Sequence, residues 1–206
     1  MSSDFVKSIK EHQSAFGLGL TDEQIARLAD YYQLILEHNE ILHLVAPMTA
    51  EEFAIRHILE SLTLLEHLPM TTKLADVGAG AGLPSIPCLI VRDGLKAILI
   101  ESKEKKAKFL ETAIESLGLT ARVKIVNSQF EEADLVNCEY VTCRALDKFT
   151  EKLPRLLKWS RKRDLLLFGG NNLAAALQKQ GVLFDQKLMP MSEQRFLFFR
   201  KNSTAI

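Results

Sequence analysis

The sequence predicts an α/β fold in which helices cover both faces of a mostly parallel β-sheet. The first observation is a series of short apolar runs of strand length: 73–77, 97–100, 123–126, 140–142, 165–168 and 194–199. The second observation is that glycines or helical segments separate these runs. Because parallel strands need a crossover connection that is usually a helix, this alternation is typical of a sheet buried on both faces.

Residues 1–70 are predicted to form a helical extension of the α/β domain, which covers residues 71–206. Thr21 to Gln24 has the pattern of a capping box. Apolar residues follow it at helical spacing: Ile25, Leu28, Ala29, Tyr32, Ile35 and Leu36. A second helix is predicted over about 50–68. Within the α/β domain, helices are predicted to include 86–92 and 103–117, and Gly118 ends the latter.

Length and composition are those of an ordinary globular protein. A chain of 206 residues fits one domain with an extension. Hydrophobic residues make up 47% and charged residues 25%, which does not favour disorder. The formal net charge is zero. Neutrality neither indicates nor excludes a nucleic-acid partner, because local patches matter more than the sum.

Cysteine usage and the N-terminal residues indicate a cytoplasmic protein. Cys88, Cys138 and Cys143 are odd in number and lack the spacing of metal ligands, which favours free thiols in a reducing compartment. Residues 1–10 are polar and charged, unlike a signal peptide. No apolar stretch approaches the roughly 20 residues of a membrane helix. We therefore expect neither a membrane segment nor a metal site, and a monomer, since no long exposed heptad pattern calls for a partner.

A glycine-rich loop follows the first predicted strand. The segment runs Asp76-Val77-Gly78-Ala79-Gly80-Ala81-Gly82-Leu83-Pro84. Glycines at every second position permit unusual φ values and leave backbone N–H groups accessible to a ligand. Glu101, at the end of the second predicted strand, is placed to accept hydrogen bonds from both hydroxyls of a ribose. A structural turn in an α/β domain is the alternative interpretation.

The spacing of the loop distinguishes two nucleotide ligands. A dinucleotide-binding fold has G-x-G-x-x-G with an acidic residue about 20 positions later. Here the third glycine comes one position early, and Pro84 and Pro87 follow it, which is compatible with a helix start. The pattern Asp-x-Gly-x-Gly-x-Gly is more similar to the first motif of S-adenosylmethionine-dependent methyltransferases.

Four further segments strengthen this similarity: Arg56-His57-Ile58-Leu59-Glu60-Ser61-Leu62, Gly82-Leu83-Pro84-Ser85-Ile86-Pro87, Glu101 to Leu110, and Cys143-Arg144-Ala145. Together they closely resemble the bacterial small-subunit rRNA methyltransferase family called RsmG, or glucose-inhibited division protein B. The resemblance runs from about Asn39 to Arg200. It implies a Rossmann-like class I methyltransferase fold and transfer of the methyl group of S-adenosylmethionine to N7 of guanine 527, in the 530 loop of 16S rRNA.

The resemblance also implies site residues. The expected cofactor-binding residues are Asp76, Gly78, Gly80, Gly82, Leu83, Glu101, Ser102, Lys103, Phe130, Glu131 and Arg144. Among these, Glu101 to Lys103 match the family's segment on the ribose side of S-adenosylmethionine. Phe130-Glu131 match the family's pair of residues beside the adenine. Arg144 matches an arginine next to the place where the methyl donor and guanine meet.

The chain departs from the family pattern at three places. His43-Leu44 stands where the family often has Asn-Leu, after a first asparagine matched by Asn39. Pro84-Ser85 replaces Pro-Gly, which we expect to be harmless. Phe168 replaces a lysine before the glycine near the fifth strand. If that lysine holds RNA, substrate affinity or activity is affected more than cofactor binding.

The expected chemistry needs no general base. Guanine N7 has an in-plane lone pair, so the enzyme's main task is to align N7, the methyl carbon and sulfur. Positive charge moves to the purine in this reaction, so Arg144 is assigned instead to guanine O6, an RNA phosphate or the cofactor carboxylate. Cys143 is interpreted as a small residue beside the pocket and not as a nucleophile.

Two basic clusters are candidates for RNA contact, with solvated helix faces as the alternative. One contains Lys103, Lys105, Lys106 and Lys108, and the other runs from Lys152 to Arg163 around Trp159. The expected RNA-binding residues are Arg56, His57, Lys105, Lys106, Arg155, Lys158, Arg161, Lys162 and Arg195. His57 is equally well explained as a structural histidine beside Glu60, and Trp159 as a core residue. The expected partner is 16S rRNA or the small ribosomal subunit. A methyltransferase for another substrate, or a weakly active RNA- or ribosome-associated module, are the alternatives.

Overall fold

The computed structural model describes residues 3–144 and 149–200 of the chain. In these residues one seven-stranded sheet has the strand order β3-β2-β1-β4-β5-β7-β6. Its strands are β1 (Thr72–Val77), β2 (Leu95–Ile100), β3 (Val123–Val126), β4 (Tyr140–Arg144), β5 (Asp164–Gly169), β6 (Asp185–Leu188) and β7 (Phe196–Arg200). The four pairings among β1 to β5 are parallel, as the sequence predicts, and β7 runs antiparallel to both β5 and β6.

The strand β6 is absent from the sequence-based prediction. Its residues are Asp185, Gln186, Lys187 and Leu188, and none of them is buried. A strand at the edge of a sheet packs little apolar surface, so its sequence lacks the apolar run that indicates a buried strand. Only its antiparallel pairing with β7 identifies this segment as a strand.

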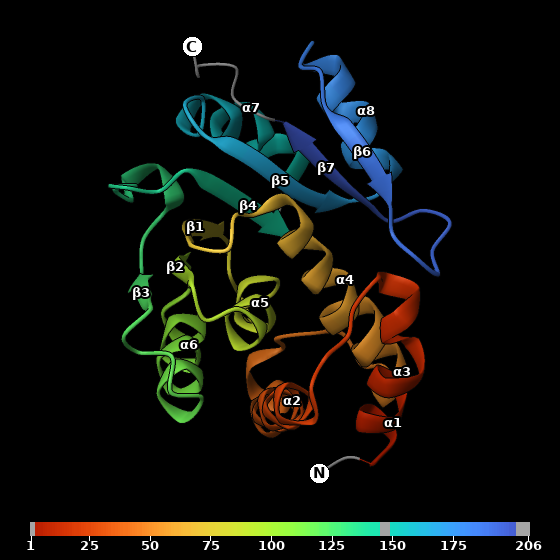
Figure 1. Cartoon of the computed structure of the whole chain (residues 1–206). Helices are drawn as coiled ribbons and strands as arrows, with labels where there is room; N and C mark the ends of the chain where they lie inside the picture. Colours follow the sequence, from red (N-terminus) through yellow and green to blue (C-terminus); the bar gives the residue numbers. More distant parts are fainter. Residues whose placement is uncertain (1–2, 145–148, 201–206) are drawn as a thin grey trace.

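Helices cover both faces of the sheet (Figure 1). Helices α5 (Ser85–Val91) and α6 (Glu104–Ser116) lie on one face, and α7 (Phe149–Trp159) and α8 (Asn171–Lys179) lie on the other. A short 3₁₀ helix, η4 (Phe130–Glu132), follows β3. Gly118 adopts a left-handed φ of 67° just after α6, as its expected role at the helix end requires.

The predicted N-terminal helical extension is present. It comprises α1 (Ser3–His12), η1 (Gln13–Phe16), α2 (Asp22–Leu42), α3 (Ala50–Phe53), the π-helix η2 (Ala54–Leu59), α4 (Glu60–Leu62) and η3 (Thr63–His67). The predicted capping box at Thr21 is formed, with Gln24 as its second member. The segment 50–68 is predicted as one helix, but in the structure α3, η2, α4 and η3 follow one another there, so the helix type changes three times.

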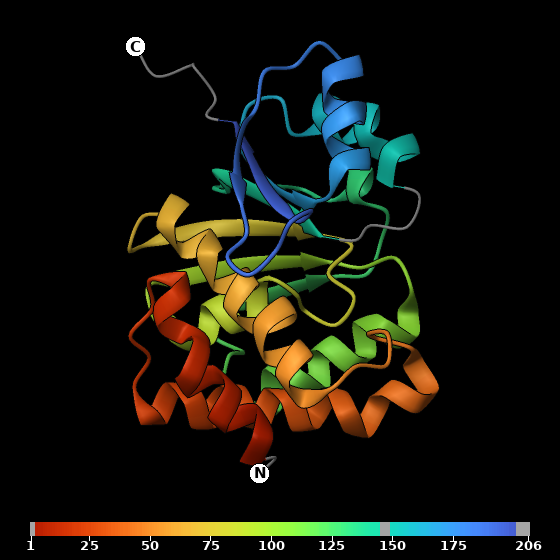
Figure 2. The same ribbon diagram turned by 90° about the vertical axis from the view of Figure 1, so that its right-hand side faces the viewer.

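The extension packs as an outer layer against α5 and α6 (Figure 2). Arg27 on α2 donates hydrogen bonds to the carbonyls of Ile90 (3.4 Å) and Leu117 (3.1 Å), near the C-terminal ends of α5 and α6. Carbonyls at a helix end have no partner within the helix, so α2 stabilises both ends. Apolar residues of the extension share one core cluster with β1, β2, α5 and α6.

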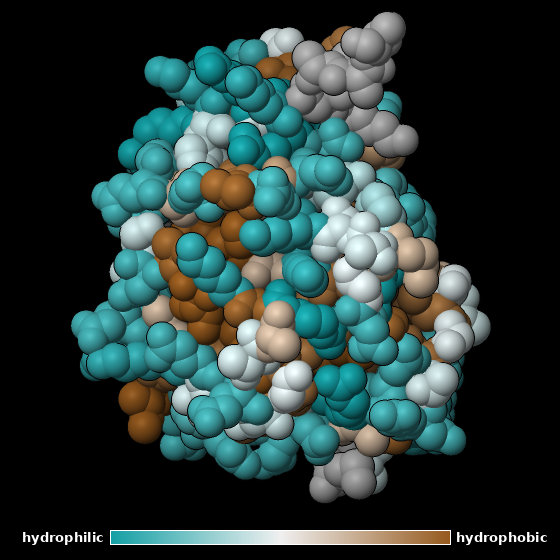
Figure 3. Space-filling view, turned by 60° about the vertical axis from the view of Figure 1, so that its left-hand side comes forward, coloured by the Kyte–Doolittle hydropathy of each residue, from teal (hydrophilic) through white to brown (hydrophobic). Residues whose placement is uncertain are grey.

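The described surface gives no sign of a membrane span. No helix in residues 3–144 and 149–200 is long and apolar enough to cross a bilayer. On the face shown in Figure 3, hydrophilic residues dominate, and apolar residues gather near the centre.

Candidate active site

The glycine loop between β1 and α5 adopts the backbone that its sequence predicts. Gly78, Gly80 and Gly82 all have positive φ values, of 69°, 55° and 92°. A Cβ at Gly82 would lie 2.3 Å from Cδ1 of Ile86, so this position excludes any side chain for steric reasons as well. Tyr31 on α2 donates a 2.8 Å hydrogen bond to the carbonyl of Ala81. The helical extension thus supports the loop directly.

Asp76 lies beneath the loop and not in its open side. The residue is fully buried, and Ser85 Oγ donates a 2.7 Å hydrogen bond to its Oδ2. Burial raises the pKa of Asp76 to about 7, against the lowering effect of the Ser85 hydrogen bond. The second oxygen, Oδ1, has no hydrogen-bond partner among the described residues. The departure at Ser85 therefore adds a bond that glycine could not make.

Glu101 links the glycine loop to the end of β2. Gly80 N donates to Glu101 Oε2 at 2.9 Å, and Lys103 N donates to Oε1 at 2.8 Å. Each carboxylate oxygen accepts one backbone bond and keeps capacity for another. The geometry is compatible with the expected role of Glu101 as acceptor for two ribose hydroxyls.

A cavity of about 400 Å³ lies beside the loop at the carboxyl ends of the parallel strands. Such an edge is where open α/β sheets bind ligands. Its lining residues are Leu44, Val45, Ala46, Met48, Arg56, His57, Gly78, Ala79, Gly80, Ala81, Leu83, Glu101, Ser102, Lys103, Lys106, Arg144, Lys152 and Arg195. Six are cations and one is a carboxylate, so the cavity is strongly positive in a chain whose net charge is zero.

Apolar residues from the α2–α3 connection form one wall of this cavity, which the sequence analysis did not predict. They are Leu44, Val45, Ala46 and Met48. Asn39 holds the connection, because its side chain both accepts from Val45 N (2.9 Å) and donates to Val45 O (3.0 Å). His43 adopts a left-handed φ of 46°, a conformation that asparagine enters more readily. This explains why an asparagine suits the position.

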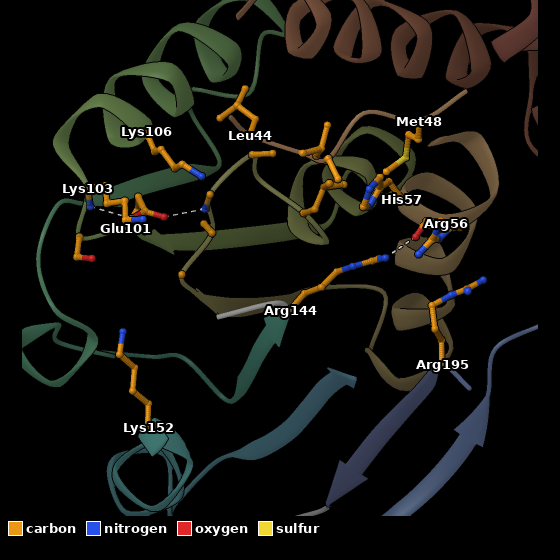
Figure 4. Close-up of a pocket in the computed structure, with 18 residues that line it drawn as sticks. Leu44, Met48, Arg56, His57, Glu101, Lys103, Lys106, Arg144, Lys152 and Arg195 are labelled. Atoms are coloured by element: carbon orange, nitrogen blue, oxygen red, sulfur yellow. Dashed lines mark hydrogen bonds between the residues drawn. The ribbon is translucent and has the colours of Figure 1, made fainter. Parts of the chain in front are cut away.

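Arg144, at the end of β4, lies in the cavity wall, and both of its terminal nitrogens donate hydrogen bonds (Figure 4). It donates to the carbonyl of Arg56, to Ser61 Oγ at 3.3 Å and to Glu60 Oε2 at 3.3 Å. Its guanidinium carbon lies 5.4 Å from the centre of the Phe168 ring, within the range of a cation–π interaction. The departure at Phe168 thus places an aromatic face against Arg144.

Glu60 was not among the predicted site residues, although it lies in one of the segments that carry the family resemblance and was named as a neighbour of His57. Its carboxylate is buried and contacts both Arg144 and Arg195, and Arg195 Nε donates to Oε1 at 2.6 Å. The segment Arg56 to Glu60 includes the π-helix η2, a helix type often found at functional sites. The feature of the sequence that could have pointed to Glu60 is its position, four residues after Arg56.

His57 lines the cavity beside Met48 (Figure 4). Neither ring nitrogen has a hydrogen-bond partner among the described residues, so no bond to Glu60 supports the structural interpretation. Burial, together with the charges of Arg144, Arg56 and Arg195, lowers the pKa of His57 to about 3. The imidazole is therefore neutral near pH 7.

The expected adenine side is a small hollow next to the cavity. Phe130 lines it together with Gly78, Ser102 and Lys152. The side chain of Glu131 points elsewhere, because it forms a 3.0 Å ion pair with Arg155 on α7. Lys152 lines both hollows, although it was not among the predicted site residues. In the sequence, only its place in the basic cluster from Lys152 to Arg163 pointed to a role for Lys152.

The predicted RNA-binding residues separate into three groups. Arg56, His57, Lys106 and Arg195 line the cavity. Arg155, Lys158 and Arg161 line a shallow hollow around Trp159, whose half-buried ring contacts Phe130 edge-on at 5.3 Å. Lys105 and Lys162 are exposed and line neither hollow.

The described residues contain no cluster of three or more side chains suited to a metal ion. Cys88, Cys138 and Cys143 are all buried. Burial raises the pKa values of the Cys88 and Cys138 thiols, that of Cys138 to about 11. Cys143 is fully covered within β4 and does not line the cavity. Ala145, which completes the predicted motif, lies outside the described residues, as do 1–2 and 201–206 at the ends of the predicted domains.

The sheet order and the loop define a Rossmann-like class I methyltransferase fold, and solved structures agree. A methyltransferase from Aquifex aeolicus, described as SAM-dependent, matches with a TM-score of 0.56 and 15% identity, over 78% of this chain and 96% of that one. TrmK of M. capricolum, solved with S-adenosyl-homocysteine, matches with a TM-score of 0.53 and 16% identity, over 68% and 65%.

The model of the family described as rRNA small subunit methyltransferase G matches residues 24–190, and the chain belongs to this family. A relative with that name from Pelotomaculum thermopropionicum is 44% identical over 57% of this chain and 50% of its own length. One from Sorangium cellulosum is 36% identical over 76% and 68%. One from Caulobacter vibrioides is 39% identical over 66% and 63%. The matches thus span between half and about two thirds of these relatives.

Proposed function

We propose that the chain is an S-adenosylmethionine-dependent methyltransferase that modifies N7 of guanine 527 in the 530 loop of 16S rRNA. The observation that supports an RNA substrate is the charge of the cavity. Among the described residues that line it are six cations, Arg56, Lys103, Lys106, Arg144, Lys152 and Arg195, against the carboxylate of Glu101, and Glu60 pairs with two of these cations, Arg144 and Arg195. Phosphate groups bind to concentrated positive charge, and the neutral chain as a whole does not supply it.

The residues beside the loop fit the cofactor. Gly80 and Gly82 keep the backbone free of side chains, and Glu101 has acceptor capacity left for ribose hydroxyls. Ser102, Lys103 and Phe130 would lie along the nucleoside, with Gly78 and Leu83 against the amino-acid end and Asp76 beneath the loop. Glu131 would contribute through its backbone, since its side chain pairs with Arg155. When bound, S-adenosylmethionine supplies an electrophilic methyl group.

The cavity suits an acceptor atom that needs no deprotonation. Glu101, the one carboxylate among the described lining residues, is held by two backbone N–H groups, and His57 is neutral, with three arginines nearby that oppose its protonation. Neither group is well placed to take up a proton. Guanine N7 attacks through a lone pair, so positioning the two reactants is sufficient. Arg144, fixed in the wall by its internal hydrogen bonds, would orient the purine.

The exposed basic residues would bind RNA that flanks the target. Arg155, Lys158, Arg161 and Lys162 lie on and after α7, and Lys105 lies on α6. Lys152, which lies on α7 with Arg155 and Lys158, lines the cavity and so connects this surface to it. We infer a monomer that meets the small ribosomal subunit in the cytoplasm, where that substrate is found.

A weakly active RNA-associated module is the second candidate, because Phe168 replaces the family's lysine. The buried ring of Phe168 contacts Arg144 instead of presenting a charge. The absence of this one cation, with six others present at the cavity, favours reduced RNA affinity over loss of catalysis.

The test is methyl transfer from labelled S-adenosylmethionine to small subunits that lack the modification. Cleavage of the RNA at 7-methylguanine should map the label to guanine 527, and subunits with adenine at that position should remain unlabelled. Label on another base, or no label at all, would overturn the proposal. A Phe168→Lys variant that raises a weak activity would favour the second candidate.

A further inference from the structure

A single buried carboxylate connects two arginines that lie far from it in the sequence, Arg144 84 positions and Arg195 135 positions after Glu60. Glu60 is 1% exposed, and its two oxygens contact different partners. Oε2 lies 3.3 Å from Arg144 Nη2, and Oε1 lies 2.6 Å from Arg195 Nε. A buried carboxylate is costly unless it is paired and hydrogen-bonded, so this arrangement fixes both arginines in place.

The two arginines differ in the hydrogen bonds that they have left to offer. Arg144 is 13% exposed, and both of its terminal nitrogens already donate to Ser61, to Glu60 and to the carbonyl of Arg56. The ring of Phe168 covers one side of its guanidinium. Arg144 is therefore held mainly in the wall of the cavity and keeps fewer free N–H groups than Arg195.

Arg195 is held at one nitrogen and free at the others. Its Nε donates to Glu60, whereas Nη1 and Nη2 have no hydrogen-bond partner in the part of the chain that the structure describes. Its side chain is 34% exposed and lines the cavity. Its backbone is also fixed, because Arg195 N donates to Ser192 Oγ at 3.1 Å and its carbonyl accepts from Met189 N at 2.9 Å.

We propose that Glu60 is a positioning residue that holds Arg195 so that its two terminal nitrogens bind a phosphate of the RNA acceptor. This inference rests on the proposed function and assigns a contact within it. A planar guanidinium with two free nitrogens matches the oxygens of a phosphate in a bidentate arrangement. Because Glu60 and the backbone have already fixed the side chain, little conformational entropy remains to be lost on binding.

The position of Arg195 favours RNA over the cofactor carboxylate. Arg195 precedes β7 and lies across the cavity from Glu101 and Lys103, which hold the expected ribose side (Figure 4). Arg56 also lines the cavity, but its side chain is exposed and has no clamp comparable with Glu60. Arg195 is thus a cavity cation whose guanidinium is held by a buried carboxylate and still has both terminal nitrogens available.

The experiment compares affinity for unmethylated small subunits at several salt concentrations for wild type, Arg195→Met, Arg195→Lys and Glu60→Gln. Arg195→Met should weaken subunit binding by roughly ten- to a hundredfold, as for loss of hydrogen bonds to a charged group. It should reduce the slope of log K against log salt by about one. Arg195→Lys should retain the slope but only part of the affinity. Glu60→Gln should weaken binding although both arginines remain.

Lys187→Met is the matched control, because Lys187 is an exposed cation on β6 whose ion pair with Glu66 lies outside the cavity. It should bind like wild type. Thermal melts identify any variant that fails to fold; if Glu60→Gln fails, the two Arg195 variants decide. An unchanged salt slope in Arg195→Met would overturn the inference, as would weaker binding of S-adenosylmethionine with normal subunit binding. If wild type binds subunits but transfers no methyl group, the proposed function fails while the contact stands.

Discussion

His57 and Asp76 illustrate how single residues acquire properties that their identities alone do not give. Both pKa values are displaced mainly by burial, which disfavours the charged form. For His57 the direction is down, to about 3, and for Asp76 it is up, to about 7. Each residue is therefore neutral over much of the acidic range, where the free side chain would be charged.

The first prediction concerns the titration of His57. Its imidazole should remain neutral from pH 8 to pH 5, so its ring proton signals in an NMR titration should not shift over this range. The His57→Gln variant identifies the signals by their disappearance. A midpoint near 6.5, the ordinary pKa of histidine, would contradict the environment described here.

The lowered pKa of His57 also affects how the stability of the folded protein depends on pH. Between pH 6.5 and about 3 the unfolded chain binds a proton at His57 that the folded chain does not, so this residue lowers the free energy of unfolding as pH falls. His57→Gln should therefore lose less stability than wild type between pH 6.5 and 4. Urea unfolding at both pH values gives the difference, and parallel curves for the two proteins would contradict the expectation.

At the scale of elements, the glycine loop and the π-helix η2 bring the site together. The loop gives the cofactor side its bare backbone, and η2 places Arg56 and His57 at the cavity, with Glu60 next in the chain buried against Arg144 and Arg195. A π-helix has a wider turn than an α-helix, so side chains that follow it project differently from those of a regular helix. The periodicity of the sequence does not distinguish the two.

The second prediction compares two glycines of positive φ. Gly82→Ala should cost about 1–3 kcal/mol more than Gly118→Ala, because its Cβ would meet Ile86 and Leu110 whereas a Cβ at Gly118 meets nothing within 4 Å. Both variants share the backbone strain of about 1–2 kcal/mol. Urea unfolding measures the difference.

Binding of S-adenosylmethionine separates the two variants further. Gly82→Ala distorts the loop and should weaken binding in calorimetry, and Gly118→Ala, at the far end of α6, should bind normally. Equal stability and equal affinity for the two variants would show that the packing around Gly82 has no special role.

For the whole molecule, the helical extension and the α/β domain share one core. Phe5, Tyr32 and Phe53 pack together in the extension, with ring centres 4.7 Å apart for the first pair and 4.6 Å for Tyr32 and Phe53. The same cluster of buried residues continues into α5 and α6. The two predicted parts are therefore separate in sequence but joined in packing.

The third prediction follows from this shared core. The full chain should unfold in a single cooperative transition, and residues 71–206 alone should not, because removing the extension exposes the apolar surfaces of α5 and α6. Circular dichroism during heating tests both, with binding of a hydrophobic dye as a second measure. Two separate transitions in the full chain, or cooperative unfolding of the shorter one, would contradict it.

The sequence by itself determined the parallel strands, the glycine loop and the position of Glu101 at the end of β2. These features are local: apolar runs, glycines and residues at strand ends depend on neighbours in the chain. Four of the residues expected to bind RNA, Arg56, His57, Lys106 and Arg195, line one cavity, although they come from separate parts of the sequence.

Only the tertiary structure decided how these residues share their interactions. Glu60 lies 84 positions from Arg144 and 135 from Arg195, and no sequence pattern over such distances indicates that it bridges them. The same holds for the pairing of Glu131 with Arg155 and for the place of Lys152 in the cavity. Charged side chains choose partners by geometry and burial, which exist only once the sheet has formed.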